Sequence, residues 1–185
     1  MRKMVTLTMV WLVMSSVFAA ELPIVNGDFE LPAIRGKIPG WSLSQHAGGT
    51  AYEMGVVPSD QAGGKQNFQM HRLSPQVYGL ISQDVPVQWR PDQYLELSAL
   101  MKGREVGEQG WLLVMNFMGG GSSRLPSGII KQLRSEPLVG SSDWARMAVR
   151  APIPEGTRFV SIGAMLLDDG TGWVDDFRLQ LLDAP

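Results

Sequence analysis

The chain of 185 residues contains no cysteine and only two histidines. The absence of cysteine excludes disulfide bonds, thiolate metal sites and a cysteine nucleophile. His46 and His71 belong to no metal-ligand spacing such as HExxH, and the GGGSS segment at 119–123 lacks the Lys of a phosphate-binding loop and the GxSxG elbow of a hydrolase. Adjacent acids at 168–169 and 175–176 can serve glycoside hydrolysis, but such pairs at turns are more often hydrated or metal-bound. We therefore expect a non-catalytic protein.

Clustered positive charge is also missing. The 16 basic residues face 18 acidic ones and are scattered along the chain, which argues against a nucleic-acid partner. Arg2 and Lys3 stand at the start of the chain, before an apolar run at 4–18 that is followed by small residues. This layout is typical of a secretory signal peptide.

The apolar run is too short and too often interrupted by Thr and Ser to be a good membrane span, which needs ~20 apolar residues. An uncleaved anchor is the weaker alternative. We expect residues 1–19 to be a signal peptide cleaved after Ala19, with no stable membrane insertion of the remainder. The expected location is the bacterial periplasm or the extracellular medium, since an animal extracellular module more often carries disulfides.

Residues 20–185 are expected to form one domain, because the chain is long enough for one substantial core only. No segment has a sustained helical period; short apolar or alternating runs are separated by turn residues, among them 21 Gly and 12 Pro. This pattern predicts an all-β jelly roll, a β-sandwich of two antiparallel sheets. The segment 119–143 is the least regular, with room for one short strand. The expected strands are 24–31, 41–46, 50–57, 66–73, 78–85, 94–102, 111–118, 144–151, 159–167 and 172–182.

The closing stretch at 170–182, GTGWVDDFRLQLL, places two acids side by side in a strand. Successive side chains of a strand point to opposite faces, so Asp175 and Asp176 are expected to diverge. One carboxylate can then meet a partner, such as a cation shared with Glu30 or Asp28 near the start of the domain.

Several segments, in order, resemble the carbohydrate-binding modules of families 4, 9 and 22, whose fold is the galactose-binding-like β-sandwich. Each segment alone is weak, but their succession is specific for the fold; it is less specific for the ligand, because the same sandwich also serves protein contacts. The resemblance implies an exported carbohydrate-binding domain. The alternative is a structural or protein-interaction module of the cell envelope with the same fold and no sugar site. The matching segments are NGDFEL (26–31) with GW (40–41), SDQAGGKQNFQM (59–70), VYGLISQDVPV (77–87), YLELSALMKG (94–103), 143–166 and GTGWVDDFRL (170–179).

The resemblance also implies a structural Ca²⁺, which prefers six to eight oxygen ligands at ~2.3–2.6 Å. The implied ligands are an acid of the opening segment, carbonyls of a glycine-containing turn and the second acid of the closing pair, which correspond to Glu30, the segment 59–66 and Asp176. The weaker candidates are Asp28, Asp60 and Asp175. In the alternative interpretation, Asp28 and Asp60 cap turns and Asp175 is hydrated.

A sugar site needs an exposed aromatic plane for the C–H face of the sugar ring and polar groups for its hydroxyls. Tyr78 occupies the position at which several members of the resembled families have a stacking Trp. The polar residues near it in the sequence are His71, Arg72 and Gln83, and further candidates that are individually more compatible with a structural role are Glu96, Trp111 and Asn116. Of the other tryptophans, Trp41 and Trp144 are expected in the core, and Trp89, near two prolines, at the surface.

Overall fold

A computed structural model describes residues 19–46, 50–60, 64–120 and 128–183. Residues 1–18 of the expected signal peptide, and parts of the segments 59–66 and 119–143, lie outside the described residues. Within the described ranges, no helix is long and apolar enough to cross a membrane.

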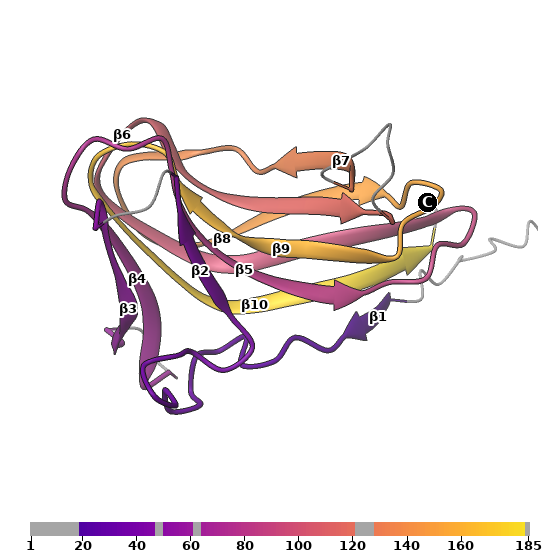
Figure 1. The fold of residues 1–185 in the computed structure, drawn as a ribbon, viewed down its shortest axis with the longest axis horizontal. Helices are drawn as coiled ribbons and strands as arrows, with labels where there is room; N and C mark the ends of the chain where they lie inside the picture. The colour runs from indigo at the N-terminus through magenta and orange to yellow at the C-terminus, as the bar shows by residue number, and fades with distance from the viewer. Residues whose placement is uncertain (1–18, 47–49, 61–63, 121–127, 184–185) are drawn as a thin grey trace, which may run out of the picture.

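The described chain folds into ten antiparallel strands that form a two-layered sandwich (Figure 1). The strand β6 belongs to both layers: its first half pairs with β10 and β8, and its second half pairs with β9 and β7. The strands are β1 (Ala19–Leu22), β2 (Ser42–Gln45), β3 (Tyr52–Pro58), β4 (Gln66–Arg72), β5 (Gly79–Pro86), β6 (Gln93–Met118), β7 (Ile129–Arg134), β8 (Leu138–Pro152), β9 (Phe159–Leu166) and β10 (Thr171–Asp183).

We call the layer β2-β5-β9-β6-β7, which uses the second half of β6, the β9 sheet. The other layer, the β10 sheet, contains β3, β4, β10, the first half of β6, and β8. Along its free side, β10 pairs first with β4 and then with β1 (Figure 1). Between these two pairings the register of β10 shifts from Asp175 to Arg178, and the N–H of Phe177 donates to the carbonyl of Gly27 at 2.9 Å. The N-terminal segment therefore fills the gap that this β-bulge opens.

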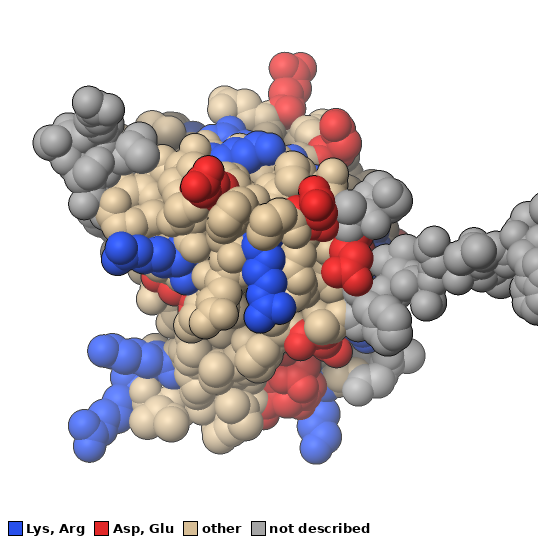
Figure 2. Space-filling view, turned by 90° about the vertical axis from the view of Figure 1, so that its right-hand side faces the viewer, with Lys and Arg blue, Asp and Glu red and all other residues tan. Residues whose placement is uncertain are grey.

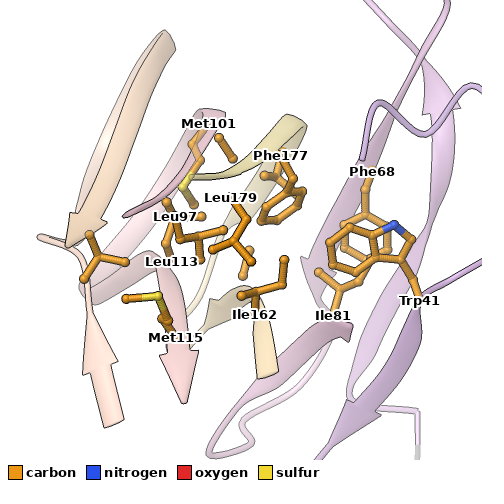
Figure 3. Packing of buried hydrophobic residues seen from close by; sticks show 14 of the residues in the cluster. Trp41, Phe68, Ile81, Leu97, Met101, Leu113, Met115, Ile162, Phe177 and Leu179 are labelled. Atoms are coloured by element: carbon orange, nitrogen blue, oxygen red, sulfur yellow. The ribbon is translucent and has the colours of Figure 1, made fainter. Parts of the chain in front are cut away.

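The two sheets enclose one large apolar core (Figure 3). Alternation along each strand supplies it: in β5 every second residue from Gly79 to Val85 is buried, and in β6 the same holds from Leu95 to Met101. Phe29 and Trp41 join the core beside Phe177, with ring centroids 5.4 Å apart for the first pair and 4.8 Å for Trp41 and Phe177. Trp41 is thus a core residue, as predicted.

The predicted all-β jelly roll is confirmed, whereas several element boundaries differ. Residues 24–31 form turns and not a strand, with positive φ at Asn26 (55°) and Phe29 (54°). The two strands expected at 94–102 and 111–118 are one continuous strand, because bulges let β6 bend from one sheet into the other without ending. The irregular segment 119–143 contains β7 and the start of β8.

Candidate functional site

The face of the β9 sheet that points away from the core, here called the β9 face, carries side chains in cross-strand rows. The first row is apolar and joins Leu80, Met165 and Leu112. The second row has Ser82 opposite Gly163 and Gly163 opposite Val114. Leu112, Val114 and Met165 form a cluster separate from the main core, and Tyr78 packs against it. The β9 face therefore has an apolar floor at one end.

The third row is polar. Register places Asp84 opposite Ser161, Ser161 opposite Asn116, and Asn116 opposite Gln132. The buried Oδ1 atom of Asn116 has no hydrogen-bond partner among the described residues. A buried amide oxygen without a partner lowers the free energy of unfolding by about 1–3 kcal/mol. A ligand hydroxyl or a water that donates to the Asn116 oxygen would therefore be stabilising.

Tyr78 lies at the apolar end of the β9 face, next to exposed His46. The two rings are 5.8 Å apart between centroids and tilted by 59°, and the backbone N–H of His46 donates to the Tyr78 carbonyl at 3.1 Å. Tyr78 is half-buried, so part of its ring stays open to solvent. His46 was not among the predicted site residues, because only the β2–β5 pairing brings it to Tyr78.

Phe159 lies at the opposite end of the same face, in the fourth row between Pro86 and Met118. It lines a pocket of about 350 Å³ together with Asp84, Pro86 and Arg158. Asp84 and Arg158 are exposed and take part in no ion pair among the described residues. Eight residues of β-strand separate this row from Tyr78, roughly 26 Å. The β9 face thus has an aromatic ring at each end and polar groups between them.

Two of the predicted sugar-binding residues point into the protein instead. Trp111 is completely buried (0% exposed), and its Nε1–H donates to the carbonyl of Trp173 at 3.1 Å, so its ring has no surface to offer a sugar. Gln83 is also buried; its Oε1 accepts the N–H of Val25 at 2.8 Å and its Nε2 donates to the Val25 carbonyl at 2.9 Å. Both residues stabilise the fold.

Three other predicted binding residues belong to the β10 sheet. His71 Nδ1 lies 2.9 Å from the hydroxyl of Thr171. Arg72 pairs with Asp168 at 3.3 Å. Glu96, on the outer side of β6, stands opposite Arg150 in the neighbouring strand. The structure therefore brings Tyr78 and Asn116 to one face and places these three elsewhere.

Two acids from opposite ends of the domain meet at the β10 bulge. A Cβ placed on Gly64 would lie 3.2 Å from Asp175 Oδ2 and 3.5 Å from Glu30 Oε1, so both carboxylates face this glycine. Glu30 Oε1 also accepts the N–H groups of Lys65 (2.5 Å) and Gln66 (3.1 Å). Asp175 is 4% exposed, and its burial, together with the charges of Asp176, Asp28 and Glu30, raises its pKa to about 6.

Asp176, the acid of the closing pair expected to bind metal, pairs with two guanidinium groups instead. Arg146 donates to its Oδ2, and Arg178 does so at 2.9 Å. The physical reason is the bulge: Asp176 has a φ of 49°, which turns its side chain outward and leaves Asp175 facing Glu30.

The remaining candidate metal ligands have other partners. Asp60 pairs with Lys102 at 2.5 Å and accepts the Nε1–H of Trp144 at 2.9 Å. These hydrogen bonds hold its pKa below the ordinary value. Asp28 Oδ1 accepts the N–H of Glu30 at 3.3 Å, which is the turn-capping role. In the part of the chain that the structure describes, no three His, Cys, Asp or Glu residues are grouped to hold a metal ion.

Trp144 also departs from its predicted place. It is half-buried on β8, where its indole contacts Asp60, and it does not belong to the core.

On the end of the sandwich drawn in Figure 2, basic and acidic side chains are interspersed among uncharged ones.

Neither a protein-family model nor a curated protein matches the sequence. Solved structures do match. The enzymatically active domain of tailspike protein 4 of bacteriophage CBA120 has a TM-score of 0.62 at 17% identity, covering 85% of this chain and 21% of that one. The CBM22-1 and GH10 modules of Clostridium thermocellum xylanase 10B, solved with xylohexaose, have a TM-score of 0.59 at 12% identity, covering 86% of this chain and 28% of that one.

A family 61 carbohydrate-binding module in complex with β-1,4-galactotriose has a TM-score of 0.55 at 17% identity and covers 86% of this chain and 98% of that one. This chain therefore spans less than a third of the first two proteins and nearly the whole of an isolated module. The resemblance drawn from the ordered sequence segments is confirmed for the architecture: the chain has the galactose-binding-like β-sandwich fold of carbohydrate-binding modules.

Proposed function

We propose that residues 20–185 are an exported, non-catalytic domain that binds an oligo- or polysaccharide on the β9 face. The observation that carries the proposal is the unpartnered Oδ1 of Asn116 in a polar row between two partly open rings, Tyr78 and Phe159. Sugar rings stack on aromatic planes while their hydroxyls bond to amide, hydroxyl and carboxylate groups, and the β9 face supplies both kinds of contact. Solved structures of similar fold that contain xylohexaose or galactotriose support the proposal that a domain of this fold binds a sugar chain.

In this proposal each row has a separate role. Tyr78 supports one sugar unit through its ring, with His46 holding the ring in place. Asn116 accepts a hydrogen bond from a sugar hydroxyl at Oδ1 and donates one from its amide nitrogen, and Ser161 beside it offers a hydroxyl. Each such hydrogen bond contributes about 0.5–1.5 kcal/mol, so affinity depends on several rows acting together.

A glycan array tests the proposal, with Tyr78→Ala and Asn116→Ala as variants and Tyr94→Ala as the matched control. Tyr94 is also half-buried, but it lies on the β10 sheet against Arg150, 5.1 Å from its ring centroid. We expect at least one glycan to bind the native domain and the Tyr94 variant equally, and the other two variants about tenfold more weakly. Absence of binding to any glycan, or equal binding by Tyr78→Ala, would favour the structural or protein-interaction module instead.

We also propose that Ca²⁺ binds between Glu30 and Asp175. These residues fit the ion: both carboxylates face Gly64, and Asp175 is buried among other acids without a cation beside it among the described residues. Backbone carbonyls and water would complete the six to eight oxygens, since two carboxylates cannot. Bound Ca²⁺ would tie the start of the domain to its last strand, and the residues of the β9 face take no part in holding it.

A further inference from the structure

A second pocket lies on the other side of the sandwich, on the outer face of the β10 sheet. It has a volume of about 540 Å³, and we call it the Trp173 pocket. Trp173 of β10 stands directly opposite Lys102 of β6. Lys102 follows buried Met101 in the strand and therefore points away from the core, and the indole of Trp173 points to the same side. The residues that line it are Asp60, Lys102, Gly103, Arg104, Ser141, Ser142, Asp143 and Trp173.

The charges in this pocket are not equally satisfied. Lys102 forms an ion pair with Asp60 at 2.5 Å. Asp60 also accepts the Nε1–H of Trp144. Exposed Arg104 has its Cζ 5.5 Å from the centroid of the Trp173 ring and forms no ion pair among the described residues. The cation–π contact with the indole orients the guanidinium of Arg104 but uses none of the N–H groups of the guanidinium. Arg104 can therefore donate two parallel hydrogen bonds to a carboxylate.

A carboxylate completes the pocket. The Oγ of Ser141 accepts the N–H of Glu105 at 3.0 Å. The buried Oγ of Ser142 lies 3.6 Å from the Cβ position of inward-facing Gly103, so it points toward the core and not into the pocket. Asp143 uses one oxygen for the N–H of Trp144 at 2.8 Å and has the other to accept from a hydroxyl. A ligand that fits these groups has one carboxylate, a hydroxyl next to it and an apolar ring face.

We propose that the Trp173 pocket binds an acidic sugar, a pyranose that carries a carboxylate. The carboxylate pairs with Arg104, a ring hydroxyl bonds to Asp143, and the C–H face of the sugar packs against partly buried Trp173, over which Lys102 and Arg104 also lie. Asp143 favours this ligand over phosphate or an acidic peptide, because it repels a group that has only anionic oxygens to offer. The site is separate from the β9 face, so it does not depend on the proposed function of that face.

Titration calorimetry with an oligogalacturonate and with its methyl ester tests the proposal, since the ester keeps the ring and removes the charge. We expect the acid to bind at least tenfold more tightly than the ester. Arg104→Gln should lose this preference without loss of folding because Arg104 is exposed, and Arg35→Gln, another exposed arginine, should keep it. Tyr78→Ala should also bind the acid normally, which separates this result from any failure of the β9 face.

Three results would overturn the proposal. Equal affinity for the acid and the ester, or no binding of either, would show that Arg104 does not bind a sugar carboxylate. Unchanged binding by Arg104→Gln together with loss in Tyr78→Ala moves the ligand to the β9 face. Binding of a polyglutamate peptide as tight as that of the oligogalacturonate, abolished by Arg104→Gln, replaces the sugar by an acidic peptide.

Discussion

Gln83 ties the N-terminal segment to the β9 sheet through the N–H and the carbonyl of Val25, at 2.8 and 2.9 Å. We expect Gln83→Leu to lower the free energy of unfolding by about 2 kcal/mol, because two partly buried backbone groups lose their partner. Chemical denaturation with urea measures this change. Gln132→Leu is the matched control, since Gln132 is exposed on β7 and should leave stability unchanged. Equal stability of Gln83→Leu and the native domain would contradict the structural role of Gln83.

At the residue scale, strand alternation alone could have excluded one of the predicted binding residues, Gln83. Gln83 has the same parity as buried Ile81 and Val85, so its place inside the sheet was readable from the sequence. Asp84, the next residue, has the outward parity and lies on the β9 face. Phe159 could not be identified in the same way, because only the pairing of β9 with β5 and β6 shows which residues share its row.

At the scale of elements, the β5–β9 pairing depends on a glycine. A Cβ added to Gly163 would lie 1.9 Å from the carbonyl oxygen of Ile81, so β5 and β9 could not keep their present distance. We expect Gly163→Ala to cost at least about 1–3 kcal/mol and to weaken glycan binding, because the polar and apolar rows lose their register. Thermal unfolding and the glycan array measure the two effects.

Gly55 provides the control for this substitution. It lies in β3, and a Cβ there would meet no atom within 4 Å, so Gly55→Ala should change stability by no more than about 0.5 kcal/mol. If Gly163→Ala were as stable as Gly55→Ala, the close approach of β5 and β9 would be wrong.

The elements also show where sequence reasoning failed. The turn at 24–31 has the alternating apolar residues of a strand, but positive φ at Asn26 and Phe29 folds it across the end of the core. The bulge in β10 had a similar effect on the acids: Asp175, and not Asp176, faces Glu30, while Asp176 pairs with Arg146 and Arg178. Bulges insert a residue without a distinct sequence signal, so the positions of strands were easier to predict than the direction of single side chains near them.

At the scale of the whole molecule, the raised pKa of Asp175 makes stability depend on pH, and the proposed metal site adds a dependence on Ca²⁺. Its pKa in the folded protein, about 6, exceeds the ordinary 3.8, so without metal its contribution to stability is complete below pH 4 and is lost as the pH rises through 6. The loss amounts to at most about 3 kcal/mol by pH 8. In EDTA at pH 8, we therefore expect Asp175→Asn to unfold at a higher temperature than the native domain.

Calcium should reverse this order. With excess Ca²⁺ at pH 8 the native domain should melt several degrees higher than in EDTA, whereas Asp175→Asn should respond little. Asp28→Asn is the control, because Asp28 is a turn-capping acid close to the same charges. An unchanged melting temperature of the native domain with Ca²⁺ would contradict the metal site.

The overall architecture was the most predictable level. Nine of the ten expected strands overlap a separate observed strand or one half of β6, because the period of two and the turn residues are local signals. The proposed binding face was only partly predictable: Tyr78 and Asn116 were identified, while His46, Asp84 and Phe159 depend on contacts between strands far apart in the sequence.

The location of a bound glycan tests the central claim most directly. Nuclear magnetic resonance of the isotope-labelled domain, titrated with the best glycan from the array, gives this location residue by residue. The account predicts that the largest shifts occur at the backbone amides of Ser161 and Gly163 and at the side-chain amide of Asn116, with further shifts near Tyr78. Shifts confined to the β10 sheet, with the signals of the β9 face unmoved at saturation, would contradict it.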